Sequence, residues 1–170
     1  LMDELETARQ RYTSPAAAGL VLDIESGEIV GSASLPAIDP SRPEELMDRR
    51  FADRLTSGVY ELGSVFKLAT IAMAVDSGQA SLDTVYDVRK PLTIGRFTIN
   101  DLHPVGRPLT VREVFLHSSN VGAGMMALEA GTERQKSFLS RLGLLQPMRT
   151  EAGGVGPPLP PESWGGIEEG

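Results

Sequence analysis

The chain has 170 residues, of which 41% are hydrophobic, and this is enough for one sizeable apolar core in a globular domain. Its formal net charge is −7, and its basic residues form no cluster longer than Arg49-Arg50, which argues against nucleic acid as a partner. The sequence contains no cysteine, which excludes disulfides and thiolate metal sites, and no apolar run approaches the ~18 residues of a membrane-spanning helix.

The first elements predicted along the chain are a helix and a β-hairpin. Strong helix formers fill residues 2–10, and the segment before Pro15 should end that helix. Two β-rich runs follow, at residues 19–24 and 28–35, on either side of a turn at residues 25–27. We expect a hairpin in which both strands are at least half buried.

The most apolar stretch of the chain follows a long surface connection, residues 37–55, that has no clear periodicity. Residues 65–75 are apolar at almost every position, which predicts a helix buried on nearly all sides, and Gly78 should end it. Three polar side chains, spaced three residues apart, share one side of this helix and begin at its first turn: Ser64, Lys67 and Thr70. A buried helix with one polar stripe is typical of a reaction site.

Ser64 and Lys67 are suited to nucleophilic catalysis. A serine hydroxyl needs a neighbouring base to take its proton, and a lysine one helical turn away can reach it. Burial lowers the pKa of a lysine and favours the neutral amine, which an arginine could not supply. The N-terminus of the helix could stabilise an oxyanion beside Ser64, and Gly63 would let a substrate approach the backbone. On the pattern alone, a capping Ser64 and a solvent-reaching Lys67 are an equally good explanation.

A second, smaller hairpin is predicted at residues 92–99, followed by the sequence D-L-H-P. Asp101 and His103 could suggest a catalytic or metal-binding role, but they lack the ligand count and spacing of a metal site. We therefore predict structural hydrogen bonding in a loop. His117 receives the same interpretation, because it falls late in a predicted helix, where a partly charged imidazole is favoured.

Two capping boxes mark helices in the second half of the chain. Thr110-x-x-Glu113 should open a helix that ends near residues 118–120, and Thr132-x-x-Gln135 should open one that Gly143 ends. Between them, residues 121–130 form a small, apolar helix closed by the glycine at position 131.

Several residues of this half are assigned to packing. Gly122 and Gly124 should permit close helix packing, and Met125 and Met126 should fill the core. In the Gly/Pro-rich tail, Trp164 should anchor an otherwise irregular segment by packing.

Ser118-Ser119-Asn120 has a plain structural explanation, because serine and asparagine habitually cap and separate helices. Beside an upstream S-x-x-K, however, S-x-N supplies a hydroxyl that can relay a proton to a leaving amine. It also supplies an amide that can hold the lysine and the substrate. The pairing of S-x-x-K with such an element occurs in penicillin-binding proteins and class A β-lactamases. Ser119 in the middle position fits transpeptidases better.

Taken in order, the motifs resemble the transpeptidase domain of class B penicillin-binding proteins, specifically the septal cell-division type. The resemblance runs from about Arg11 to Glu168 and rests on Y-E-L-G-S-V-F-K, V-L-D-I-E-S-G-E-I-V-G-S-A-S-L-P, G-R-F-T-I-N-D-L-H-P, S-S-N-V-G and W-G-G-I-E. It implies an α+β fold of the β-lactamase/transpeptidase type, with helices packed on a mainly antiparallel sheet, incomplete in this chain. It also implies a D,D-transpeptidase that cross-links peptidoglycan and is acylated by β-lactams.

The resemblance assigns roles to the site residues. It makes Ser64 the nucleophile, with its backbone N–H as half of the oxyanion hole, Lys67 the general base, and Ser118 and Asn120 the S-x-N pair. Residues expected to contact the substrate are Gly63, Thr70 and Ser119. It implies no cofactor and no metal. Two departures are Leu62, where many members have proline, and the absence of a K-T-G motif.

The resemblance also implies a domain organisation and a cellular setting. Residues 1–14 would be a leading helix and linker, and residues 15–170 the N-terminal part of the domain, inactive alone because the K-T-G strand lies outside it. Implied partners are stem peptides, β-lactams, division-complex membrane proteins and the remaining half of the same domain, but no nucleic acid. The implied location is the periplasmic side of the inner membrane, with an N-terminal anchor that is absent from this sequence.

Other functions remain open at this point. Within the same superfamily, a D,D-carboxypeptidase or a serine β-lactamase would present the same serine and lysine to a different acceptor. From another class, the domain could be a β-lactam-sensing receptor or a non-catalytic division scaffold.

Overall fold

The computed structural model describes residues 1–150 and 155–159, and these form two compact units. The first unit comprises Leu1–Tyr60 and the described residues between 147 and 158. The second comprises Glu61–Gln146 and Leu159. Trp164, expected to anchor the tail, lies outside the described residues.

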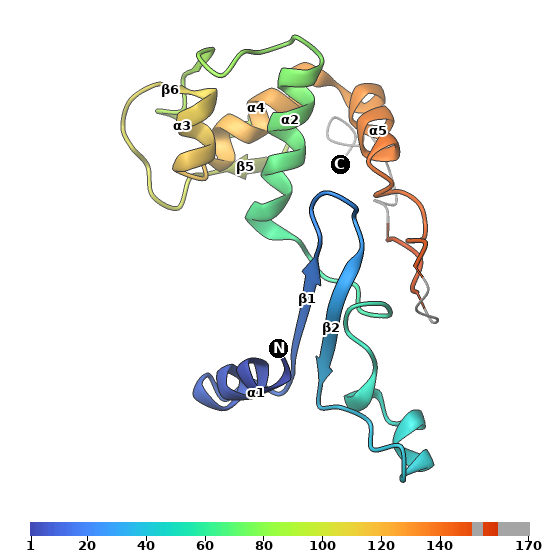
Figure 1. Ribbon diagram of the computed structural model, residues 1–170. Helices are drawn as coiled ribbons and strands as arrows, with labels where there is room; N and C mark the ends of the chain where they lie inside the picture. Colours follow the sequence, from blue (N-terminus) through green and yellow to red (C-terminus); the bar gives the residue numbers. More distant parts are fainter. Residues whose placement is uncertain (151–154, 160–170) are drawn as a thin grey trace. The chain divides into compact units, whose positions relative to one another are not determined.

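The first unit is built on a helix and a hairpin, both as predicted (Figure 1). Its elements are α1 (Met2–Arg11), β1 (Ala17–Leu22), β2 (Ile29–Leu35) and the short 3₁₀ helices η1 (Pro43–Met47) and η2 (Arg49–Phe51). Acidic residues in the first turn of α1 and arginines in its last turn complement the helix dipole. The leucine side chains at positions 1 and 5 reach Gly19, so that α1 contacts β1.

The hairpin is more exposed than its sequence suggested. β1 and β2 pair antiparallel from Ala17 opposite Leu35, and the Asp23 carboxylate accepts hydrogen bonds from backbone N–H groups in the connecting turn. The expectation that both strands are at least half buried is wrong at Val30 in β2, which is 68% exposed. In β1, Leu20 and Leu22 are each 49% exposed, so this strand is only about half covered. Successive side chains of a strand point to opposite faces, so a face that nothing covers stays in solvent. Within the described residues no third strand pairs with this hairpin.

The second unit combines four helices with short antiparallel strands. Its elements in chain order are η3 (Gly63–Phe66), α2 (Lys67–Asp76), β3 (Val85–Tyr86), β4 (Leu92–Ile94), β5 (Phe97–Ile99), β6 (Leu109–Thr110), α3 (Val111–Leu116), α4 (Asn120–Ala130) and α5 (Thr132–Arg141). β4 pairs with β5 as predicted, and β3 pairs with β6. Every strand pair in the described part of the chain is antiparallel.

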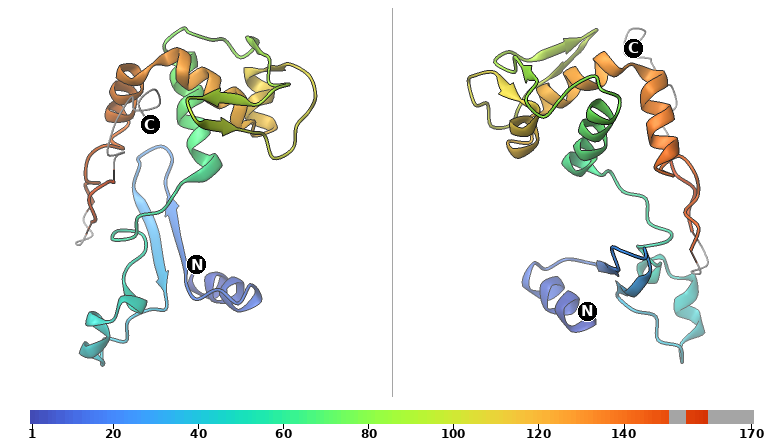
Figure 2. Two further views of the ribbon diagram at one scale, coloured as in Figure 1. Left: turned by 180° about the vertical axis from the view of Figure 1, so that it is seen from behind. Right: turned by 45° about the horizontal axis from the view of Figure 1, so that its top comes forward.

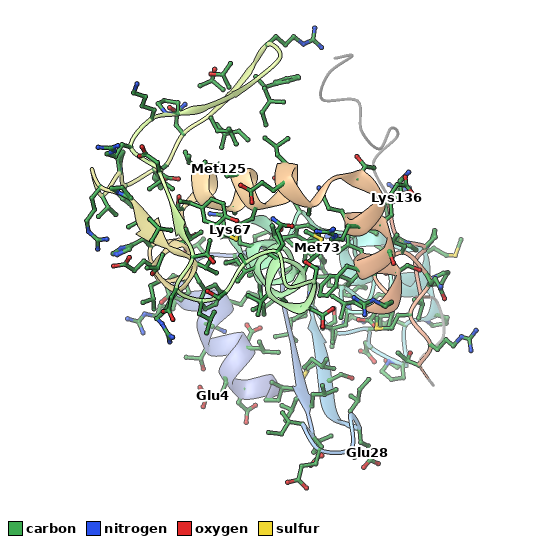
Figure 3. All side chains as sticks on the ribbon, turned by 90° about the horizontal axis from the view of Figure 1, so that it is seen from above. Glu4, Glu28, Lys67, Met73, Met125 and Lys136 are labelled. Atoms are coloured by element: carbon green, nitrogen blue, oxygen red, sulfur yellow. The ribbon has the colours of Figure 1, made fainter. Side chains whose placement is uncertain are left out.

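The core of this unit lies between α2, α3 and α4. Met126 is fully buried there, and Met125 packs against its edge, so the assignment of both methionines to packing is confirmed (Figure 3 labels Met125). The buried side chains of this core are Ile71, Ala74, Ala80, Tyr86, Val88, Leu109, Val111, Val114, Val121 and Met126.

Helix α2, which the sequence predicted to be buried on nearly all sides, is covered by other elements on one side only. Ile71, Met73 and Ala74 are buried, whereas Leu68 of the same helix is 56% exposed and Val65, in η3 just before it, is 73% exposed. The expectation of a helix buried on nearly all sides is therefore wrong, because apolar composition does not reveal which face meets a neighbouring element. The helix does end where predicted, with Gly78 just beyond it at φ 69°.

One of the two predicted capping boxes is present. Thr110 Oγ1 accepts from the Glu113 N–H while the Glu113 carboxylate accepts from the Thr110 N–H. The second is wrong, because Gly131 caps α5 and Thr132 is already helical. Gln135 donates its side-chain amide to the Ala127 carbonyl instead of reaching back to the cap.

Gly122 brings α4 against α3, as expected. A Cβ added there would lie 2.5 Å and 2.9 Å from the two methyl groups of Val114. Because a valine is stiff about χ1 and this one is fully buried, it cannot move aside cheaply.

We therefore expect Gly122→Ala to lower the free energy of unfolding by about 1–3 kcal/mol, the usual cost of overpacking a core. Urea unfolding followed by circular dichroism measures this change. The matched control is Gly31→Ala in β2, where no described atom lies within 4 Å of an added Cβ. Equal stability of the two variants would contradict the packing argument.

Candidate active site

The site begins at the turn that leads into helix α2. Gly63 has φ 55°, a left-handed conformation that glycine adopts without steric cost, and it starts the 3₁₀ turn η3. This turn runs directly into α2, so that Ser64 lies one turn ahead of Lys67. No described atom lies within 4 Å of a Cβ added at Gly63, which agrees with the expectation that the backbone there is approachable.

Lys67 connects two distant segments of the chain. Its Nζ donates to Ser64 Oγ at 3.3 Å, to Ser118 Oγ at 2.9 Å and to the Ser118 carbonyl at 2.5 Å. Ser118 lies between α3 and α4, 51 residues further along the chain. Figure 3 shows the labelled Lys67 in the second unit. The structure thus brings together the predicted nucleophile, the predicted base and the predicted relay hydroxyl.

The electrostatic setting of Lys67 makes its neutral form easier to reach than that of an ordinary lysine. Burial lowers the pKa of this lysine below its ordinary value, because an ammonium loses hydration in the protein, and the Asp101 carboxylate opposes this effect. The net direction is downward, which raises the fraction of free amine near neutral pH. A free amine at this position can accept the Ser64 proton.

The other two residues of the S-S-N turn make hydrogen bonds away from Lys67. Ser119 is only 1% exposed; its Oγ caps α4 by accepting from the Gly122 N–H. Asn120 donates its side-chain amide to the Asn100 carbonyl at 2.8 Å. Neither side chain joins the cluster of Ser64, Lys67 and Ser118 in the described hydrogen bonds.

Thr70 lies one turn beyond Lys67 on α2 and is half buried. Its side chain makes no hydrogen bond to the cluster among the described residues. The structure therefore places it beside the site and outside the hydrogen-bonded group.

Asp101 makes the structural hydrogen bonds that the sequence predicted, and its charge also affects Lys67. It makes structural hydrogen bonds, accepting from Ser119 Oγ and from the Val121 N–H. Its charge also acts on Lys67, a link that sequence spacing could not reveal because Asp101 and Lys67 lie on different elements far apart in the chain. No group of three His, Cys, Asp or Glu residues in the described chain could hold a metal ion.

Comparison with known proteins places these residues in a family. Residues 17–169 match the penicillin binding protein transpeptidase domain. The chain belongs to this family. The resemblance seen in the motifs is thereby confirmed.

The chain is also similar to curated proteins named as peptidoglycan D,D-transpeptidases. The chain is 38% identical over 164 residues to the "Probable peptidoglycan D,D-transpeptidase FtsI" of Caulobacter vibrioides, an alignment that covers 96% of this chain and 28% of the relative. It is 33% identical over 142 residues to the "Probable peptidoglycan D,D-transpeptidase PenA" of Neisseria gonorrhoeae, covering 84% of this chain and 24% of the relative. The chain thus spans about a quarter of the length of these relatives.

The predicted fold class is confirmed by a solved structure. Penicillin-binding protein 3 of Mycobacterium tuberculosis superposes with a TM-score of 0.85 at 27% identity, over 98% of this chain and 38% of that one. The transpeptidase-domain family therefore accounts for the mixture of helices and antiparallel strands. In the part of the chain that is described, no helix has both the length and the apolarity needed to cross a membrane.

Proposed function

We propose that this chain provides the acyl-transfer machinery of a peptidoglycan D,D-transpeptidase, and that β-lactams acylate the same serine. The observation that carries the proposal is the position of Lys67 Nζ, within hydrogen-bond reach of the hydroxyls of both Ser64 and Ser118. A nucleophile, a base with a lowered pKa and a second hydroxyl are the parts that serine acyl transfer requires.

The proposed reaction has two halves. In the first, Ser64 Oγ attacks the carbonyl carbon of the donor peptide, Lys67 accepts its proton, and the Ser64 N–H stabilises the oxyanion. The tetrahedral intermediate then collapses as the amine leaves, with a proton relayed through Ser118, and an acyl-enzyme remains. In the second, an acceptor amine attacks the acyl-enzyme and restores Ser64.

The remaining predicted site residues have supporting roles in this proposal. Asn120 supplies an amide beside Ser118, and Gly63 leaves room for the substrate next to the nucleophile. Thr70 flanks Lys67, and Ser119 acts through the cap of α4 rather than by direct contact, since its side chain is buried.

We propose that residues 15–170 form the N-terminal part of the transpeptidase domain, preceded by a leading helix and linker at 1–14. The relatives described above extend well beyond the matched region, which supports this division. Peptidoglycan lies outside the inner membrane, so we place the domain on the periplasmic side, with division-complex membrane proteins as partners. This rests on the relative named FtsI.

Labelling with a fluorescent penicillin tests the function. We expect the full-length protein to be labelled and mass spectrometry to place the adduct on the peptide that contains Ser64. We also expect turnover of a stem-peptide donor with transfer to an amine acceptor. Labelling without any turnover would indicate a sensor or scaffold. Rapid deacylation would indicate a β-lactamase, and release to water alone a carboxypeptidase.

A further inference from the structure

Asp101 follows β5 and makes no hydrogen bond to Ser64, Lys67 or Ser118 among the described contacts, yet both of its carboxylate oxygens accept hydrogen bonds at the start of α4. We propose that Asp101 is a positioning residue, which ties the S-S-N turn to the β4–β5 hairpin and thereby holds Ser118 against Lys67. The inference rests on the proposed function, because it assigns a role in the same site.

The contacts of Asp101 form a two-armed clamp. Oδ2 accepts from Ser119 Oγ at 2.7 Å, and Oδ1 accepts from the Val121 N–H at 2.9 Å. Ser119 Oγ in turn accepts from the Gly122 N–H at 2.9 Å. Hydrogen bonds to a carboxylate are stronger than neutral ones, and a helix N-terminus favours an anion. The clamp therefore fixes the first turn of α4 from outside the helix.

The hairpin delivers Asp101 to this place by packing along α4 (Figure 2). Leu92 and Ile99 reach the position of Gly124, where an added Cβ would lie 2.8 Å and 3.5 Å from their methyl groups. Asp101 follows Ile99 by two residues and so arrives one turn nearer the N-terminus of the helix. Between them, the Asn100 carbonyl accepts from the side-chain amide of Asn120, which adds a third tie.

Ser118 needs to be held in place. Its φ of 52° is in the left-handed region, which a serine rarely adopts. On one side its turn is fixed to α3, where the Ser119 N–H donates to the Val114 carbonyl at 2.9 Å. On the other side the Asp101 clamp fixes α4. Without the clamp the turn can relax, and the Ser118 carbonyl and hydroxyl then move away from Lys67.

Asp101 also affects the protonation of Lys67. Its charge raises the pKa of the lysine against the lowering that burial causes. Other charged groups on the elements packed against α2 are paired elsewhere: Glu113 with Arg107, Glu129 with Tyr86, and Arg141 with Asp76. The further charged groups on α3 and α5 are Arg112, Glu133, Arg134 and Lys136, and the His117 imidazole directly precedes Ser118 in the chain.

The test is Asp101→Asn in the full-length protein. Both the parent and the variant carry His117→Gln, so that the imidazole next to Ser118 cannot contribute to the pH profile. An asparagine keeps the size of the side chain but accepts through one oxygen only and carries no charge. We expect the plateau rate of acylation by a penicillin to fall about 10²-fold, the effect of a small misplacement in a catalytic group. The acid limb of the pH–rate profile should shift to lower pH, because loss of the carboxylate lowers the Lys67 pKa further.

Two further variants separate geometry from charge. Asp101→Glu keeps the charge but moves the carboxylate, so the rate should fall while the acid limb stays near its place. Asp76→Asn, at the far end of α2, makes the same chemical change away from the cluster and should alter neither quantity. An Asp101→Asn protein with an unchanged plateau and acid limb would overturn the inference, even if it were less stable.

A second measurement keeps this inference distinct from the proposed function. An NMR titration of the Lys67 ε-carbon, assigned by its loss in Lys67→Arg, should give a lower pKa in Asp101→Asn than in the parent, whether or not the protein is acylated. If Asp101→Asn fails to fold, Ser119→Ala removes one arm of the clamp and keeps the charge. It should lower the acylation rate without moving the acid limb, and an unchanged rate would refute the role of the clamp.

Discussion

Replacing Ser64 with alanine is expected to abolish acylation by penicillin and turnover of the donor peptide. Removal of a serine nucleophile costs on the order of 10⁶ in rate, because the remaining groups can bind and polarise the substrate but cannot form the acyl-enzyme. Among the described hydrogen bonds, Ser64 and Ser118 are the serines that bond to a lysine, and of these two only Ser64 lies at the entry to α2. Labelling with a fluorescent penicillin measures the loss directly.

The matched control is Ser77→Ala, because Ser77 lies just after the same helix and its hydroxyl bonds only to the Ala74 carbonyl among the described contacts. We expect this variant to label like the parent. Circular dichroism should show that both variants remain folded. Persistent labelling of the Ser64→Ala protein would mean that the nucleophile lies elsewhere.

Replacing Lys67 with arginine is expected to lower acylation by about 10²–10⁴-fold, although the positive charge is retained. A guanidinium stays protonated at all accessible pH values and cannot take the Ser64 proton, whereas Lys67 has a pKa lowered by burial. In the parent protein the rate should rise with pH as the amine loses its proton. The acylation rate of the arginine variant should lack this limb.

Lys136→Arg on α5 provides the control, because it makes the same change on a helix away from the cluster. Its rate and pH profile should match the parent. If Lys67→Arg were acylated at the parent rate, the lysine would act only through its charge, and the proposed general base would be wrong.

Local signals in the sequence predicted the elements that carry the site. The S-x-x-K spacing placed Ser64 and Lys67 on one side of a helical segment, and the Thr110 capping box set the start of α3. Each of these features depends on residues only three positions apart, so their spacing fixes their geometry.

What the sequence could not predict depends on distant contacts. The exposed faces of α2 and β2 depend on what packs against them, and an apolar stretch does not identify its partner. The Asp101 clamp requires the hairpin to dock on α4 before the carboxylate can reach Ser119. Thr132 was mistaken for a cap because Gly131, which also suits such a position, precedes it.

The three contacts of Lys67 Nζ also determine which groups of the cluster can donate a hydrogen and which can accept one. A protonated amine can donate to Ser64 Oγ, Ser118 Oγ and the Ser118 carbonyl at once, since it has three hydrogens. A neutral amine has two hydrogens and one lone pair, and a carbonyl cannot donate. Retaining all three contacts after deprotonation therefore requires one of the two serine hydroxyls to turn its hydrogen toward nitrogen. Loss of a single proton from Lys67 would in this way select which serine is polarised for attack and which remains an acceptor.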